Sequence, residues 1–110
     1  LAEETALPCF DMENSFELRF EPPDTKRFPC LALAQETARR GGAFPTLLVG
    51  ADEIAVEAFL AHRIAFPDIA GVVARVLDSW HDGAPSSLED ALSVLQEGRR
   101  RAAIACRSCN

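Results

Sequence analysis

The stretch that most constrains the fold is residues 43–62, AFPTLLVGADEIAVEAFLAH, where apolar residues recur at intervals of three and four. This spacing predicts a single helix with a continuous apolar stripe. The stripe contains Leu47, Leu48, Ala51, Ile54, Ala55, Ala58 and Phe59. Glu53 and Glu57 lie on the opposite face, but Val49 and Leu60 widen the stripe until little of the helix surface is polar. Such a helix needs neighbours on most sides, so we expect it at the centre of a helical bundle.

Three further stretches predict helices around this central one. The first begins at residues 27–29 and ends at Gly41-Gly42, after two arginines, and the third begins at Asp68. The last begins at residues 86–89, SSLE, where a serine is followed by a glutamate three places later, as in a capping box. We expect Gly98 to weaken that helix. The predicted core consists of Leu31, Ala34, Leu48, Ala51, Ile54, Ala55, Phe59, Ile69, Val72, Val73, Val76, Leu92 and Leu95.

Residues 16–21, FELRFE, differ from the rest of the chain because apolar and charged side chains alternate with a period of two. This pattern predicts a half-buried strand, which the prolines at 22 and 23 then stop. A lone strand leaves its backbone groups unpaired, so its partner must lie outside this sequence or in a second copy of the chain. Self-association through this strand is therefore one expectation.

The predicted organisation is an all-α, four-helix bundle-like domain preceded by an extended segment. Residues 1–26 form the lead-in with the orphan strand, residues 27–102 form the helical domain, and residues 103–110 form a disordered tail. The chain begins at Leu1 and its one methionine is Met12, so we expect it to be part of a longer protein.

Composition excludes several classes of protein. A formal net charge of −6 argues against nucleic-acid binding, which needs a basic surface. The sequence has no signal-peptide pattern and no apolar run long enough to span a membrane. Four cysteines are too few for a secreted disulfide scaffold of this length, so we expect a reducing compartment.

The cysteines suggest one chemical alternative, a small zinc or thiol protein. Cys106 and Cys109 form a C-x-x-C motif, and Cys9 and Cys30 bring the number of thiols to four. Structural zinc sites usually bring two such pairs, whereas this chain has one. The motif also lacks the strand-to-helix turn that a thioredoxin-like redox site uses. The more economical interpretation is a buried Cys30 and a tail without a metal.

Other polar residues give no site either. His62 and His81 have no second metal ligand at helical spacing, and Glu53 and Glu57 indicate a solvated helix face. The run at 99–101, RRR, offers cations for a phosphate, but at a helix end it is more simply solvated. We therefore predict no catalytic, cofactor-binding or metal-binding residue in this chain.

Several blocks of sequence carry a more specific signal. In order they are FEPPD at 20–24, RFPCL at 27–31, ADEIAVEAFL at 51–60, IAFPDI at 64–69 and SLEDAL at 87–92. Together they resemble the C-terminal part of the 1-deoxy-D-xylulose 5-phosphate reductoisomerase family, over roughly residues 10–102. In that family the segment is an α-helical bundle that closes the far side of a V-shaped subunit.

The resemblance implies a function for the parent enzyme and a limit for this chain. Enzymes of the family isomerise and reduce 1-deoxy-D-xylulose 5-phosphate to 2-C-methyl-D-erythritol 4-phosphate, in non-mevalonate isoprenoid biosynthesis. They use NADPH and a divalent metal, Mg²⁺ or Mn²⁺, which are bound in an N-terminal and a central domain. The resemblance thus implies a structural domain that supports its own catalytic domain, and a homodimeric parent in the bacterial cytoplasm or a plastid-type organelle. The strand would join the rest of the enzyme.

One departure from the family pattern lies in the central helix. The family usually reads Leu-Asn-Ala-Ala-Asn-Glu where residues 48–53 of this chain read LVGADE. Val49 and Asp52 thus replace two side-chain amides, which puts in doubt any polar contact that these amides make with a neighbouring domain. We also expect Gly50 to loosen the helix by up to ~1 kcal/mol relative to alanine. The alternative to this family is a free-standing helical interaction module that recruits a partner through its exposed strand.

Overall fold

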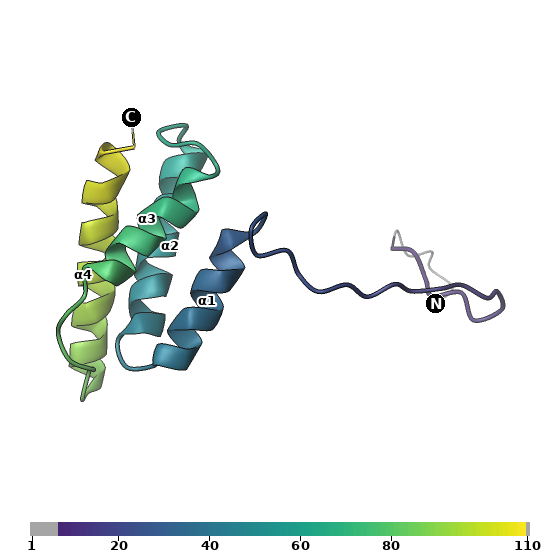
Figure 1. Ribbon diagram of the computed structural model, residues 1–110, viewed down its shortest axis with the longest axis horizontal. Coiled ribbons are helices and arrows are strands. Elements are labelled where there is room, and N and C mark those ends of the chain that lie inside the picture. The colour runs from purple at the N-terminus through teal and green to yellow at the C-terminus, as the bar shows by residue number, and fades with distance from the viewer. Residues whose placement is uncertain (1–6, 110) are drawn as a thin grey trace, which may run out of the picture.

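The computed structural model describes residues 7–109, which form four helices and no strand. The helices are α1 (Pro29–Arg40), α2 (Phe44–Leu60), α3 (Asp68–Asp78) and α4 (Leu88–Arg107). As Figure 1 shows, α1 and α4 lie on opposite sides of α2, which contacts all three other helices. The predicted all-α bundle with α2 at its centre is confirmed. No described helix is long and apolar enough to cross a membrane.

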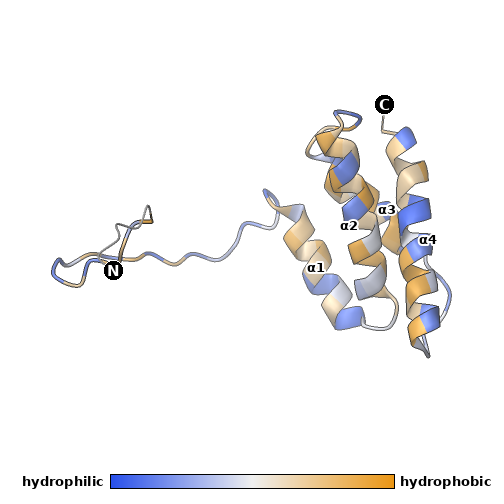
Figure 2. Ribbon diagram, turned by 180° about the vertical axis from the view of Figure 1, so that it is seen from behind, coloured by the Kyte–Doolittle hydropathy of each residue, from blue (hydrophilic) through white to orange (hydrophobic). Residues whose placement is uncertain are grey.

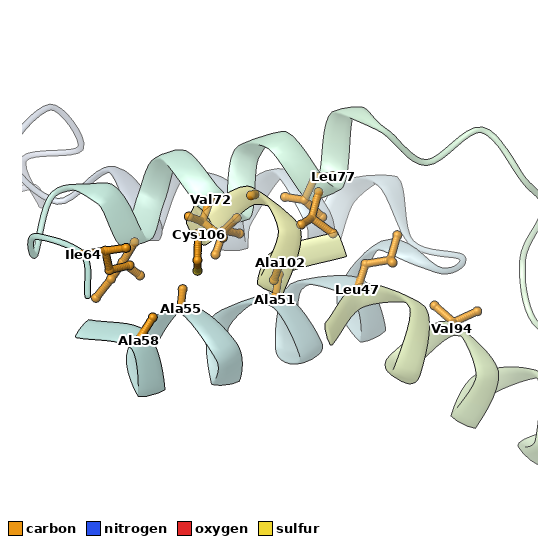
Figure 3. Close-up of a cluster of buried hydrophobic side chains, with 14 of the residues drawn as sticks. Leu47, Ala51, Ala55, Ala58, Ile64, Val72, Leu77, Val94, Ala102 and Cys106 are labelled. Carbon is orange, nitrogen blue, oxygen red and sulfur yellow. The ribbon is translucent and has the colours of Figure 1, made fainter. Parts of the chain in front are cut away.

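The core lies where α2, α3 and α4 meet, and it is built mainly from small side chains (Figure 3). Its buried residues include Leu47, Ala51, Ala55 and Ala58 of α2, Val72, Val73 and Val76 of α3, and Ala102 and Cys106 of α4. The prediction holds for Ala51, Ala55, Ile69, Val72, Val73 and Val76, which are buried. Five other predicted core residues are half-buried, namely Ala34, Leu48, Ile54, Phe59 and Leu95.

Two predicted core residues, Leu31 and Leu92, are exposed, so that part of the prediction is wrong. Leu92 is exposed because α4 turns a different face toward the bundle from the one that the prediction assumed. In α4 the small residues Gly98 and Ala102 are buried, and turning them toward the bundle leaves Leu92 outside. In α1 the one buried residue is Thr37, whose hydroxyl donates a hydrogen bond to the carbonyl oxygen of Ala34.

Glycines bring α2 and α4 close together. A Cβ atom at Gly98 would lie 3.2 Å from the carbonyl oxygen of Leu47, and Gly50 is confined more tightly, since a Cβ atom there would lie 2.7 Å from the carbonyl oxygen of Leu95 in α4. Both glycines are buried within long, uninterrupted helices. The expectation that they loosen their helices is therefore incomplete, because the same missing side chains permit the close approach of the two backbones.

The predicted disordered tail at residues 103–110 is wrong for the part of it that the structure describes. Helix α4 continues to Arg107, and Ala102, Ala105 and Cys106 are buried. These three residues are spaced i, i+3 and i+4, so they form one apolar face. That face gives the end of α4 the packing energy it needs to stay helical.

The N-terminus of α4 carries the predicted cap one residue later than expected. Ser87, rather than Ser86, is the N-cap, and its hydroxyl accepts a hydrogen bond from the backbone N–H of Asp90 at 3.1 Å. Ser86 in turn donates from its hydroxyl and its backbone N–H to the Asp90 carboxylate, at 2.7 and 3.2 Å. These hydrogen bonds lower the pKa of Asp90 below its ordinary value. Asp90, at the third helical position, therefore bonds back to Ser86, the residue before the N-cap, and not to the N-cap N–H of a strict capping box.

Residues 7–24, here called the arm, extend away from the bundle (Figure 1). Figure 2 shows apolar and polar residues interspersed along this segment. The predicted strand at residues 16–21 is not formed, and this expectation is corrected: the stretch is exposed and has no strand to pair with in the described chain. A strand needs a ladder of hydrogen bonds to a neighbour.

Candidate functional site

The four cysteines do not form the zinc site considered above. Cys9 and Cys30 are exposed, Cys106 is buried and Cys109 is half-buried, so the expectation that Cys30 is buried is wrong. Within residues 7–109, no group of three or more His, Cys, Asp or Glu side chains is placed to hold a metal ion. Burial, together with the neighbouring Cys109, raises the pKa of the Cys106 thiol, so the reactive thiolate form is disfavoured.

The two histidines lie apart from other chemistry-bearing groups. His62 is exposed and has a positive φ of 61°, just after the end of α2. There the Arg63 N–H donates to the Ala58 carbonyl at 2.9 Å and the His62 N–H to the Phe59 carbonyl at 3.0 Å. These two bonds are those of a Schellman motif, so His62 has a structural position at a helix end. His81 is exposed in the loop that precedes α4.

The arginine run at 99–101 is engaged in ion pairs, and the expectation that it is solvated is wrong for the half-buried Arg99 and Arg101 but holds for the exposed Arg100. Arg99 pairs with Glu53 of α2 at 2.6 Å, and Arg100 and Arg101 both pair with Glu97, at 2.6 and 2.8 Å. Hydrogen bonds from Arg100 and Arg101 lower the pKa of Glu97 to about 2. All three cations are thus engaged by carboxylates within the bundle, which leaves them poorly suited to hold a phosphate.

Arg101 also joins α4 to the end of α3. Its guanidinium donates to the carbonyl oxygen of Ser79 at 2.9 Å and to the Ser79 hydroxyl at 3.1 Å. The same group lies 5.3 Å from the centre of the Trp80 ring, a cation–π distance. The sequence indicates a basic helix end, but the spacing of residues along α4 does not show that Arg101 has partners at the end of α3.

One hollow surface of the bundle is a groove along α1, here called the α1 groove. It consists of two adjoining hollows of about 220 and 260 Å³, which share Cys30 and Asp52. Its lining comes from α1, α2, α3 and the residues that flank them: Arg27, Phe28, Pro29, Cys30, Ala34, Leu48, Val49, Asp52, Val56, Phe66, Ile69, Ala70 and Val73.

The α1 groove is apolar, with one acidic and one basic residue, Asp52 and Arg27, in its lining. Cys30 is exposed, but partial desolvation by the groove, and then the charge of Asp52, raises the pKa of its thiol, so this thiol stays protonated at neutral pH. The titratable side chains in this lining are thus Arg27, Cys30 and Asp52, and the other lining residues are apolar.

Val49 and Asp52 lie on the wall of this groove, three residues apart on α2. Asp52 is exposed. Val49 has 51% of its surface exposed, although α2 is the most apolar of the four described helices. The two positions that depart from the expected family pattern are therefore accessible and on one face of α2.

A family model described as the DXP reductoisomerase C-terminal domain matches residues 2–101 of this chain. The chain belongs to this family. The resemblance stated from the sequence blocks is thereby confirmed, and the α1 groove is a feature of a DXP reductoisomerase C-terminal domain.

Known reductoisomerases are similar to this domain over nearly all of its length. The 1-deoxy-D-xylulose 5-phosphate reductoisomerase of Cupriavidus metallidurans is 51% identical over 99 residues, which are 90% of this chain and 25% of that protein. The enzyme of Zymomonas mobilis is 44% identical over 100 residues, 91% of this chain and 26% of that protein. The chain thus spans about a quarter of the length of the curated relatives it matches.

A solved structure gives the same result for the fold. The Zymomonas mobilis reductoisomerase in complex with NADPH matches with a TM-score of 0.84 and 42% sequence identity. The match covers 96% of this chain and 28% of the solved chain. The DXP reductoisomerase domain described here therefore has a counterpart within a much larger enzyme.

Proposed function

We propose that this chain is the helical support domain of an enzyme that converts 1-deoxy-D-xylulose 5-phosphate to 2-C-methyl-D-erythritol 4-phosphate with NADPH. The domain supplies packing surface and no reacting group. Membership of the family and the length of the relatives support this proposal, since three quarters of each relative lies outside the match. In this proposal NADPH and the divalent metal bind to that remaining part of a homodimeric, cytoplasmic bacterial enzyme.

Residues 7–109 do not fit a metal site of their own. Carboxylate, imidazole or thiolate ligands must converge on one point to hold a divalent cation. The described residues 7–109 contain no such group of three, and Glu53 and Glu97 are each paired with arginine. We therefore derive no catalytic step from this domain.

The single observation that carries the proposal is the exposure of the α1 groove at Val49. Exposed apolar groups that line a groove mark a contact surface. Phe28 and Phe66, at the end of the groove near the start of α1, are also more than half exposed. We propose that the catalytic part of the enzyme covers this surface, and that the contact holds the metal and phosphate ligands of the catalytic part in position.

A chimaera tests this function. The last quarter of the Zymomonas mobilis enzyme is replaced by this chain, and NADPH oxidation with 1-deoxy-D-xylulose 5-phosphate is compared with that of the enzyme truncated before the domain. We expect the chimaera to turn over at least roughly 100-fold faster than the truncated enzyme, because loss of support misplaces the reacting groups. Equal rates for a folded chimaera and the truncated enzyme would overturn the proposal.

A pair of matched substitutions tests the groove. Val49→Glu places a charge on the groove wall, whereas Leu88→Glu changes an exposed leucine that does not line it. In the chimaera, we expect Val49→Glu to lower turnover strongly and Leu88→Glu to leave it nearly unchanged. Unchanged turnover in both would place the contact elsewhere on the domain.

A further inference from the structure

The C-x-x-C motif at the end of α4 is a feature that the support function does not use. Both of its cysteines lie beyond residues 2–101, the part of the chain that the family model matches. Cys106 is 6% exposed and belongs to the same buried cluster as Ala55 and Val72 (Figure 3). Cys109 is half-buried and packs against this cluster. One thiol of the motif therefore lies inside the core and the other at its edge.

The backbone of the last turn brings these two side chains together. The Cys109 N–H donates to the Cys106 carbonyl at 3.3 Å, and the Ser108 N–H donates to the Ala105 carbonyl at 3.1 Å. Such i→i+3 hydrogen bonds are those of a 3₁₀ turn, in which side chains three residues apart eclipse each other. The Cys109 thiol donates to the Ala105 carbonyl at 3.5 Å, so it points back along α4.

A disulfide between the two cysteines needs only a small adjustment. It requires Cβ atoms about 3.5–4.5 Å apart, whereas side chains three residues apart on an α-helix have Cβ atoms about 5–6 Å apart. The 3₁₀ tightening shortens this separation, and a helix end frays more easily than its middle. The last turn of α4 can therefore close the pair without moving the rest of the bundle.

The other two cysteines are not placed to compete for these thiols. Cys30 is the second residue of α1, and α1 makes no contact with α4 in the described chain. The two helices lie on opposite sides of α2 (Figure 1). Cys9 belongs to the arm, before α1. The described residues thus bring together one pair of thiols, Cys106 and Cys109.

Two arginines stand beside the buried thiol. A hollow of about 140 Å³ is lined by Arg63, Ala103, Cys106 and Arg107. Burial and the neighbouring Cys109 raise the pKa of Cys106, and the positive charge of Arg63 opposes this shift. In a chain with a formal net charge of −6, the hollow is a local exception that attracts a small anion toward a thiol.

We propose that Cys106 and Cys109 form a redox-active dithiol, which an anionic low-molecular-weight disulfide of the glutathione class oxidises to an intramolecular disulfide. This modification site goes beyond the support function proposed above. A disulfide that forms reversibly is also the kind that a reducing compartment allows.

The reaction consists of two successive thiol–disulfide exchanges. The thiolate of Cys109, the more accessible residue, attacks one sulfur of the reagent, whose S–S bond breaks and releases one reagent thiol. The thiolate of Cys106 then attacks the Cys109 sulfur, which releases the second reagent thiol. The protons of the two protein thiols end on the two released thiols. The protein pair thus loses two electrons, the reagent gains them, and an excess of the reduced reagent reverses the reaction.

Incubation of the 110-residue chain with glutathione disulfide tests the proposal, in a background that carries Cys9→Ser and Cys30→Ser. We expect the intact mass to fall by that of two hydrogen atoms, with no glutathione bound, and to recover in excess reduced glutathione. Trypsin cleaves after Arg107, so residues 102–107 and 108–110 should stay joined through the disulfide alone. Reduction of the digest should separate them.

Single substitutions in this background test the order of attack. Cys106→Ala should stop the reaction at the mixed disulfide, so that the mass rises by one glutathionyl group on Cys109. Cys109→Ala leaves the buried Cys106 alone, and it should react with glutathione disulfide about tenfold more slowly than Cys109 does. Alanine already fills much of this core, and unchanged helical circular dichroism would show that both variants fold.

Substitution of the two arginines tests the hollow. Arg63→Ala and Arg107→Ala should each slow closure by glutathione disulfide about threefold or more, because they remove a charge that attracts this anion. Closure by uncharged hydroxyethyl disulfide should stay nearly unchanged. Arg39→Ala makes the same charge change on α1 and is the matched control, so it should close at the background rate with both reagents.

Several results would overturn the proposal. A background chain that gains glutathione on both cysteines, or that stays a dithiol under conditions that oxidise dithiothreitol, would refute the pair. Arginine variants that close at the background rate with glutathione disulfide would refute the anionic reagent. Closure in the 110-residue chain that is lost in the folded chimaera would show that the rest of the enzyme covers the site. The readout is oxidation and not turnover, so failure here leaves the support function intact.

Discussion

Gly50 of α2 lies directly against Leu95 of α4: a Cβ atom at Gly50 would stand 2.7 Å from the Leu95 carbonyl oxygen and 3.3 Å from the Arg99 backbone nitrogen. Backbone cannot move aside as the end of a side chain can. The missing side chain of Gly50 therefore permits the short distance between the two helices.

Gly50→Ala is expected to destabilise the domain by about 1–3 kcal/mol, because the added methyl group overpacks the α2–α4 contact. Gly71→Ala is the matched control, since a Cβ atom there meets nothing within 4 Å. It should stabilise α3 by up to ~1 kcal/mol through helix propensity. Urea unfolding of both variants checks the prediction, and equal effects would contradict it.

Arg101→Ala should lower stability by about 1–2 kcal/mol, because it removes charged hydrogen bonds to the end of α3 and the contact with Trp80. Arg100→Ala is the control. Arg100 pairs with the same Glu97, but its side chain is 62% exposed against 24% for Arg101. Its hydrogen bonds with Glu97 stay within α4. A thermal melt should show a clear loss for Arg101→Ala and little change for Arg100→Ala. The reverse order would refute the role of Arg101 as a link between helices.

The lowered pKa of Glu97 makes the free energy of unfolding depend on pH in the acid range. The two arginines hold its pKa at about 2 in the folded state, well below the ordinary value of 4.5. A depressed pKa contributes stability that is fully present above about pH 4.5 and is lost as the pH falls through about 2. Glu97→Gln should therefore be less stable than the wild type at pH 7, and the difference should shrink between pH 4.5 and 2. Glu57→Gln on the exposed face of α2 serves as the control, and a constant gap across this range for Glu97→Gln would count against the prediction.

His62 holds a left-handed backbone conformation at the end of α2. A residue with a Cβ atom pays roughly 1 kcal/mol there, whereas glycine does not. His62→Gly is expected to raise the melting temperature, and Ala61→Gly, one residue earlier at a φ of −86°, should lower it. If both changes lowered stability equally, the conformation of His62 would carry no cost.

Much of this fold follows from periodicity alone. The spacing of apolar residues in α2 and of Ile69, Val72, Val73 and Val76 in α3 predicts both helices, because one buried stripe repeats with the helical turn. The prediction fails where small residues decide the packing. Gly50 and Gly98 look like weak points in their helices, and only the opposing backbone shows that they are contact points.

The candidate site was only partly predictable. The positions of Val49 and Asp52 stood out against the family pattern, but sequence spacing does not show that α1 leaves both exposed beside a groove. The ion pair of Arg99 with Glu53 joins residues 46 positions apart, a distance at which a linear pattern carries no signal. The exposed aromatic residues of the arm were visible as an alternating pattern, which indicates a strand but not its partner.

In the function proposed above, this chain supplies packing surface and no reacting group. The most direct measurement titrates the truncated Zymomonas mobilis enzyme with the 110-residue chain and follows NADPH oxidation together with complex formation. We expect no turnover by the chain alone and turnover that rises with formation of a stoichiometric complex. Turnover by the chain alone, or a stoichiometric complex that leaves the truncated enzyme no faster, would contradict it.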